Sequence, residues 1–125
     1  MPRELRLSPL KHTWILDFDG TLVKHNGYKT GDDEWLPGAI EFLRSIPKGD
    51  FVILLTAREE AARDRTLEFI RNADVHIDHI FFEVPMGERI LINDTKPSGL
   101  ICAHVITPSR NQGLESVNVV IDEKL

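Results

Sequence analysis

The sequence contains a single cysteine, Cys102, so no disulfide can form within the chain. No apolar run approaches the roughly 20 residues that a membrane-spanning helix needs. The first residues, 1–6, lack the apolar core of a secretory signal peptide. The formal net charge of −5 makes a nucleic-acid backbone an unfavourable partner. These absences predict a cytoplasmic protein that binds neither membranes nor nucleic acids, with Cys102 as a small buried residue rather than a nucleophile.

Apolar runs alternate with segments of helical periodicity along the 125 residues. Strands are predicted at residues 13–18, 50–56, 79–82, 89–93 and 104–107, and helices at 37–46 and 59–73. We expect residues 1–11 to be a loose lead-in, residues 20–37 to form a flap with a β-hairpin, and residues 116–121 to be an edge strand. Because most of the strands are apolar throughout, the pattern predicts one α/β domain of three layers around a mostly parallel sheet.

Two carboxylates stand at the end of the first apolar run, in the stretch Asp17-Phe18-Asp19-Gly20-Thr21. Side chains alternate between the faces of a strand, so Asp17 and Asp19 point the same way and repel each other unless a positive group joins them. A divalent cation such as Mg²⁺ would do so. Asp-Gly after a strand is also a common turn, so these residues alone leave both interpretations open.

Polar residues also follow two other apolar runs. Thr56 stands three residues before Glu59, as in a capping box, and a hydroxyl at a helix start can equally bind a phosphoryl oxygen. Asn93 and Asp94 follow the run at 89–92 and fit either a turn or a metal site. Since ligands bind outside the carboxyl ends of parallel strands, we expect all of these residues to converge with Asp17.

The stretch Asp17-Phe18-Asp19-Gly20-Thr21-Leu22 resembles the first signature motif of the haloacid dehalogenase (HAD) superfamily, most of whose members are Mg²⁺-dependent phosphohydrolases. The likeness is to small capless sugar phosphatases associated with polysaccharide biosynthesis, and it extends to about residue 107. It implies a Rossmann-like HAD fold without a cap domain over residues 1–125, with the flap within about 20–37. It also implies cleavage of a small phosphomonoester, a sugar phosphate or a nucleotide, through an aspartyl-phosphate.

The resemblance also implies roles for individual residues. Asp17 would be the nucleophile, and Asp19 would be the general acid and base. Thr56 would match the second motif and bind phosphate, together with Ala57 and Arg58 of the Thr-x-Arg sequence.

The metal ligands implied by the resemblance are Asp17, Asp19 and Asp94, with Mg²⁺ as the cofactor. Asp19 would contribute its backbone carbonyl. Asn93 stands where the family often has a second acid, and it would ligate through its own carbonyl or orient a metal-bound water.

The third motif of the family usually supplies a Lys, or sometimes an Arg, ahead of the fourth motif. No Lys lies between Lys48 and Lys96 in this chain. We therefore expect Lys96 to neutralise the nucleophile and the phosphate, with Arg89 as the second candidate. The missing Lys also keeps open a catalytically degenerate HAD domain that acts as a binding module. A second enzymatic alternative within the family is a phosphomutase that transfers the phosphoryl group to another sugar hydroxyl.

Neither insertion point of the family holds a cap domain, so an open site must be shielded by a large substrate or by a neighbouring subunit. The polar flap carries an apolar group, Tyr28, Trp35 and Leu36. Exposed apolar groups often mark an interface, although these could also pack onto their own domain. This favours a homo-oligomer. Arg110, in the Ser109–Gly113 stretch, is a further candidate for substrate contact.

Overall fold

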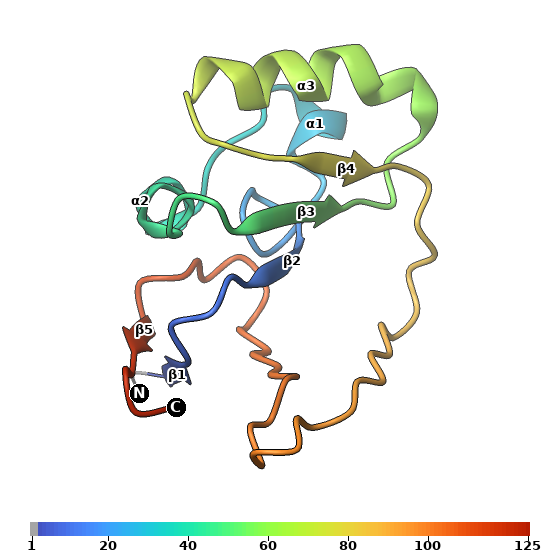
Figure 1. The fold of residues 1–125 in the computed structure, drawn as a ribbon. Coiled ribbons are helices and arrows are strands. Elements are labelled where there is room, and N and C mark those ends of the chain that lie inside the picture. Colours follow the sequence, from blue (N-terminus) through green and yellow to red (C-terminus); the bar gives the residue numbers. More distant parts are fainter. Residues whose placement is uncertain (1–2) are drawn as a thin grey trace.

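The computed structural model describes residues 3–125 (Figure 1). Its elements, in chain order, are β1 (Arg3–Leu7), β2 (Thr13–Asp17), α1 (Gly27–Thr30), α2 (Ala39–Ser45), β3 (Phe51–Leu55), a 3₁₀ turn η1 (Glu60–Ala62), α3 (Arg63–Asn72), β4 (His79–Phe81) and β5 (Val117–Ile121). None of the helices in this range is long and apolar enough to cross a bilayer.

The central sheet consists of β2, β3 and β4, which are parallel and lie side by side in that order. The connections between them carry α2 and then α3, as expected for strand–helix–strand units. In the register, Asp17 pairs with Leu55 and Leu55 pairs with Phe81, so the three strands end at one edge. The predicted strands at 13–18, 50–56 and 79–82 and both predicted helices are therefore confirmed to within a few residues.

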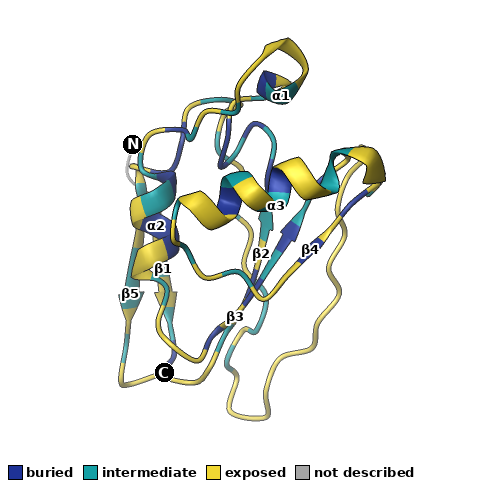
Figure 2. Ribbon diagram, turned by 90° about the horizontal axis from the view of Figure 1, so that it is seen from above, coloured by how far each residue is buried: buried dark blue, intermediate teal, exposed yellow. Residues whose placement is uncertain are grey.

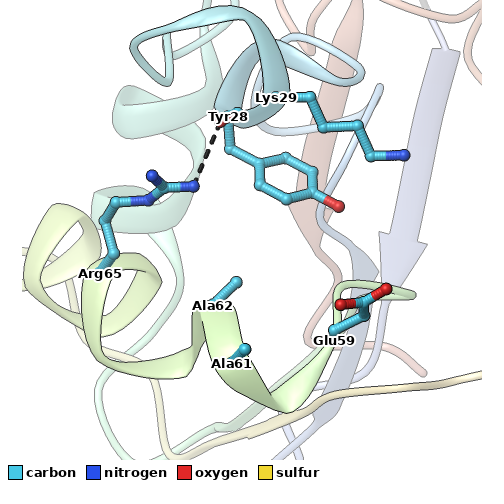
Figure 3. Close-up of a pocket in the computed structure, with 6 residues that line it drawn as sticks. All are labelled: Tyr28, Lys29, Glu59, Ala61, Ala62 and Arg65. Carbon is cyan, nitrogen blue, oxygen red and sulfur yellow. Dashed lines mark hydrogen bonds between the residues drawn. The ribbon is translucent and has the colours of Figure 1, made fainter.

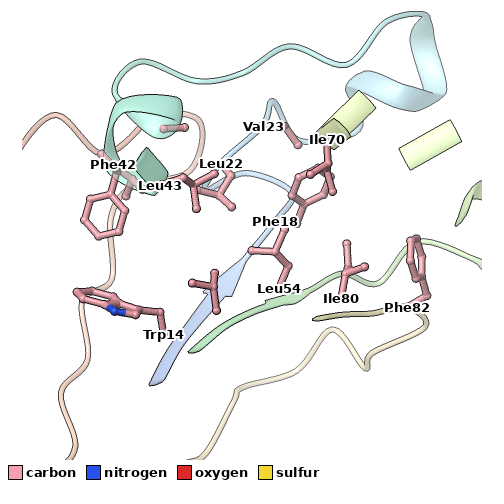
Figure 4. Packing of buried hydrophobic residues seen from close by; sticks show 13 residues of the cluster. Trp14, Phe18, Leu22, Val23, Phe42, Leu43, Leu54, Ile70, Ile80 and Phe82 are labelled. Atoms are coloured by element: carbon pink, nitrogen blue, oxygen red, sulfur yellow. The ribbon is translucent and has the colours of Figure 1, made fainter. Parts of the chain in front are cut away.

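The hydrophobic core lies on one face of this sheet, where α2 and α3 cover it (Figure 4). Trp14, Val52, Leu54 and Ile80 alternate along the strands with exposed positions and are buried. The opposite face is apolar but about half exposed, at Ile15, Phe51 and Phe81. The α/β class and the parallel sheet are confirmed, but helices cover one face of the sheet in residues 3–125, where three layers were predicted.

A buried carboxylate joins the starts of β2 and β3. Asp50 accepts hydrogen bonds from the Trp14 indole N–H at 3.0 Å and from the His12 backbone N–H at 3.2 Å, and its other contact is the His12 Nδ1 at 2.8 Å. Burial by itself would raise the pKa of Asp50, but the hydrogen bonds from Trp14 and His12 outweigh it and hold the pKa below its ordinary value.

A second, two-stranded sheet joins the two ends of the described chain. β1 pairs in parallel with β5, with Arg3 opposite Val117 and Leu7 opposite Ile121. Figure 1 shows the two strands side by side, away from the central sheet. The predicted edge strand at 116–121 is thus confirmed, and the prediction of a loose lead-in at 1–11 is wrong for β1.

Residues 84–116 contain no helix or strand, so the strands predicted at 89–93 and 104–107 are wrong. Ile90 and Ile92 are 81% and 92% exposed. Figure 2 shows much of this segment in yellow, looping along the outside of the molecule. The run has the composition of a strand, but a strand needs a neighbour for its backbone hydrogen bonds, and the outer edges of β2 and β4 do not pair with it. Cys102 in this segment is half-buried rather than buried.

The flap at 20–37 contains the short helix α1, and an antiparallel bridge between Val23 and Trp35 joins its two ends, so the predicted hairpin forms only as this short pairing. Its apolar residues pack onto their own domain, which was the alternative to an interface. The Trp35 ring stacks on Phe69 with a centroid separation of 5.0 Å, Leu36 is buried, and the Tyr28 ring covers Arg58. The flap therefore gives no support for a subunit interface.

Candidate active site

Asp17 is the last residue of β2, and its side chain is 37% exposed at the carboxyl edge of the central sheet. The Thr21 hydroxyl donates a hydrogen bond to one carboxylate oxygen at 2.9 Å. An Arg89 N–H donates to the other oxygen, also at 2.9 Å. Gly20, with a φ of +88°, makes the sharp turn that brings Thr21 back over the end of the strand. Asp17 is therefore an oriented, accessible carboxylate with one cation beside it.

Asp19 is held by two residues that follow β3. The Thr56 hydroxyl donates to one of its carboxylate oxygens at 2.6 Å, and the Arg58 Nε donates to the other at 3.0 Å. Thr56 is fully buried, and its hydroxyl also accepts a hydrogen bond from the Arg58 backbone N–H. The sequence places Thr56 and Arg58 correctly beside the carboxylate pair. In this structure the Thr56 hydroxyl positions Asp19.

Arg58 lies beneath the site, and only 2% of its surface is exposed. Besides Asp19, its guanidinium donates to both oxygens of Asp33, at 2.6 and 3.0 Å, and to the Thr66 hydroxyl at 2.9 Å. Burial by itself would lower the pKa of Arg58, but Asp33 and then Asp19 raise it more, so the group stays charged. A guanidinium enclosed in this way supports Asp19 from behind, so the predicted contact of Arg58 with substrate does not occur in this arrangement.

Asp33 is a site residue that the sequence did not reveal. Its side chain is 5% exposed, and it supplies the second carboxylate for Arg58. It belongs to an acidic, polar flap in which several carboxylates have similar neighbours, so no local signal separates it from Asp32 or Glu34. Asp33 is distinguished from its acidic neighbours only in the folded protein, where the flap brings its carboxylate to Arg58.

The positive group at Asp17 is Arg89 rather than Lys96. Both were candidates for the third motif, with Lys96 preferred. Arg89 forms a 2.9 Å ion pair with Asp17. Lys96 lies in an exposed tight turn, in which its backbone N–H bonds the Leu100 carbonyl, and none of the ion pairs within residues 3–125 includes it. The structure therefore brings the second candidate, Arg89, to Asp17.

The predicted metal ligands are not brought together. Asn93 and Asp94 are exposed, and the Asn93 amide donates to the Asp94 backbone carbonyl at 3.1 Å. Among residues 3–125, no three His, Cys, Asp or Glu side chains are grouped closely enough to hold a metal ion. The oxygens of Asp17 are taken by Thr21 and Arg89. The prediction placed Asp94 at the end of a strand of the central sheet, where it would converge with Asp17. That strand does not form, so the residues present do not fit the expected Mg²⁺ site.

A loop from the far end of the sequence completes the site. The Asn111 backbone N–H donates to the Gly20 carbonyl at 2.8 Å, and the Asn111 side-chain oxygen accepts from the His25 backbone N–H at 2.8 Å. A Cβ on Gly20 would stand 3.3 Å from the Arg110 side chain, so Arg110 lies across the turn that follows Asp17. Gly113 packs so closely on the Pro37 carbonyl that no larger residue fits there. Arg110 therefore lies beside Gly20, in the turn that follows Asp17, and its contact with substrate stays a prediction.

Ala57 is exposed beside this group, at the start of the chain segment that leads into η1. Its exposed position is compatible with the predicted phosphate contact.

Comparisons with protein-family models, curated proteins and solved structures give no match for this chain. The chemistry must therefore be argued from the geometry of Asp17, Asp19 and their partners.

Proposed function

We propose that this chain is a phosphohydrolase that cleaves a small phosphomonoester, a sugar phosphate or a nucleotide, through an aspartyl-phosphate at Asp17. The observation that carries the proposal is the ion pair at Asp17. This exposed carboxylate stands at the carboxyl end of a parallel strand and is oriented by Thr21 and Arg89. Ligand sites of α/β sheets lie at this edge, and carboxylates are known nucleophiles in phosphoryl transfer.

In the first step an Asp17 oxygen attacks phosphorus, and the bond from phosphorus to the leaving oxygen breaks. The leaving alcohol takes a proton from Asp19, which enters this step protonated and leaves it as the carboxylate that Arg58 pairs with. Arg89 offsets the negative charge that Asp17 and the phosphoryl group bring together, which lowers the electrostatic cost of their approach. Arg89 is a planar donor that can bind a phosphoryl oxygen and a carboxylate at once.

In the second step a water attacks phosphorus of the aspartyl-phosphate. Asp19 takes the proton of that water, inorganic phosphate leaves, and the Asp17 carboxylate is restored. Thr56 and Arg58 hold Asp19 through both steps, since each donates to one of its oxygens. This positioning keeps one carboxylate available to give and then accept a proton at the same place.

Mg²⁺ is expected from the resemblance, where it would neutralise charge on the phosphoryl oxygens. The described residues do not assemble its ligands, so the steps above use the cation that is present, Arg89. The proposal is tested by measuring phosphate release from sugar phosphates, nucleotides and p-nitrophenyl phosphate, with added Mg²⁺ and with EDTA. Activity that needs Mg²⁺ would show that the metal takes part in turnover, although the described residues do not gather its predicted ligands. Hydrolysis of none of these compounds under either condition would contradict the proposed function.

The second candidate is a catalytically degenerate HAD domain that binds a phosphorylated ligand without turning it over. The lack of a grouping of metal-ligating side chains among residues 3–125 favours it, because a carboxylate paired with an arginine is also a stable structural pair. Binding of a sugar phosphate without phosphate release would select this candidate. Phosphoryl transfer to a second hydroxyl of the same sugar would select a phosphomutase.

A homo-oligomer remains part of the proposal, because residues 3–125 contain no cap domain that would shield the site at Asp17. Sedimentation of the active protein tests this. A species that turns over sugar phosphate at the monomer mass of 14.2 kDa would exclude shielding by a subunit.

A further inference from the structure

The Arg58 guanidinium divides its two edges between two carboxylates. The edge formed by Nη1 and Nη2 donates to both oxygens of Asp33, at 3.0 and 2.6 Å. The edge formed by Nε and Nη2 faces a single oxygen of Asp19, at 3.0 and 2.9 Å. A bidentate contact between two planar groups fixes their relative orientation. Asp33 therefore sets the direction in which Arg58 presents its second edge to Asp19.

The other contacts of Arg58 are all to buried or covering groups. Its Cζ lies 4.9 Å from the Phe18 ring centroid and 4.1 Å from the Tyr28 ring centroid, and its Nη1 also donates to the Thr66 hydroxyl at 2.9 Å. Each of the three guanidinium nitrogens thus has an acceptor. Among these neighbours, Asp19 is the one that belongs to the proposed active site, so the orientation of Arg58 reaches the site through Asp19.

Asp33 belongs to the flap, which is held against α3 at two points. One Arg65 N–H donates to the Tyr28 backbone carbonyl at 3.2 Å, and Figure 3 shows the Tyr28 ring facing the chain segment that starts α3. The Trp35 ring, two residues after Asp33, stacks on Phe69 of α3 at a centroid separation of 5.0 Å. Asp33 lies between these two anchors in the sequence, so the flap holds its carboxylate in place beside Arg58.

We propose that Asp33 is a positioning residue for the proton transfer at Asp19, and that it acts through Arg58 without touching the substrate. The inference rests on the proposed function and gives the flap a part in it. In the first step the bond from phosphorus to the leaving oxygen breaks, and that oxygen takes the proton of Asp19. Loss of the Asp33 contact would let the Arg58 guanidinium turn, and Asp19 would then no longer be aligned with the leaving oxygen. Small misalignments of a catalytic group cost up to about 100-fold in rate.

The dependence of the rate on the leaving group separates this role from a general loss of structure. Phenyl phosphate and p-nitrophenyl phosphate are similar in size, but the nitro group stabilises the departing anion, so p-nitrophenolate leaves without a proton. The constant kcat/KM covers the steps up to departure of the leaving group, so the later hydrolysis of the aspartyl-phosphate does not enter it. A smaller kcat/KM for phenyl phosphate alone therefore reports a misplaced acid.

Asp33→Asn keeps the shape of the side chain but turns one acceptor into a donor, which breaks the bidentate contact with Arg58. The ratio of kcat/KM for phenyl phosphate to kcat/KM for p-nitrophenyl phosphate should fall by about tenfold, part of the 10²–10⁴-fold that general acid catalysis typically contributes. Asp32→Asn removes the same charge from the exposed neighbouring position of the flap. This matched control should keep the wild-type ratio.

Both constants come from one preparation, so their ratio does not depend on the fraction of the protein that is folded. If Asp33→Asn cannot be purified, Thr66→Val removes another acceptor of Arg58 at nearly the same shape and should lower the ratio in the same direction. An unchanged ratio in the variant measured, whether the two substrates lose activity equally or not at all, would overturn the positioning role and leave the phosphohydrolase standing. Wild-type protein that hydrolyses neither compound would overturn the proposed function, and this inference with it.

Discussion

Replacing Arg58 by alanine should be among the most destabilising single changes in this protein. The guanidinium is 2% exposed and carries the charge that balances Asp33 and Asp19. It also lies between the Phe18 and Tyr28 rings, at 4.9 and 4.1 Å from their centroids. Removing one partner of a buried ion pair costs about 3–5 kcal/mol, because the remaining charge stays buried without compensation. A domain of this size has a total stability of about 5–15 kcal/mol, so the loss would be a large share of it.

Urea unfolding followed by tryptophan fluorescence and circular dichroism measures this loss. The matched control is Arg63→Ala, which removes a partly exposed arginine that pairs with Glu60 and lies over the Phe82 ring, and which should move the unfolding midpoint far less. Should Arg58→Ala not fold well enough to be purified, Asp33→Asn removes one buried charge and should still lower the midpoint clearly. Arg58→Ala and Arg63→Ala unfolding at the same urea concentration would refute the buried ion-pair network.

Three further predictions follow from the same structure. Ile92→Ala should leave the free energy of unfolding almost unchanged, whereas Leu54→Ala, in the core, should lower it by about 2–5 kcal/mol; equal losses in urea unfolding would mean that residues 89–93 pack as a buried strand after all. The Asp50 pKa lies below its ordinary value of 3.8, so its contribution to stability is complete above that pH and is lost as the pH falls below it. Acid unfolding of Asp50→Asn should therefore depend less steeply on pH than that of the wild type, and identical pH profiles would contradict this. Arg89→Ala should lower kcat by about 100-fold, which is the usual effect of losing one hydrogen-bond donor to the transition state. Lys96→Ala should leave the rate of phosphate release unchanged. A larger loss of activity in Lys96→Ala than in Arg89→Ala would return the third-motif role to Lys96.

The central strands were predictable because their signal is local. The runs at 13–18 and 50–56 are bounded by polar or turn residues, and helical periodicity follows each, after the polar flap in the first case and directly in the second. The chain itself therefore marks where these strands start and stop. The clustering of Asp17, Asp19 and Thr56 followed from the same reasoning, since parallel strands end at a common edge. Local pattern and sheet geometry were sufficient for this part of the site.

The remaining features depend on contacts between distant segments. β1 is too polar to be recognised as a strand alone, and it forms only by pairing with β5, more than a hundred residues later in the chain. Conversely, residues 89–93 have the composition of a strand, but no neighbouring strand among the described residues pairs with them. The prediction of a strand from composition alone was therefore wrong there. The burial of Arg58 depends on Asp33, which reaches it from the flap.

The central claim, that Asp17 is the nucleophile, is tested most directly by trapping the phosphorylated enzyme. The protein is mixed with a hydrolysed phosphomonoester, quenched in acid and reduced with borohydride, which converts an aspartyl-phosphate to homoserine. Peptide mass spectrometry should then find homoserine at position 17 in the wild type. It should find none in Asp17→Asn, which should keep the wild-type circular dichroism spectrum but release no phosphate. Turnover by Asp17→Asn at the wild-type rate, or reduction at another carboxylate in the wild type, would contradict the account.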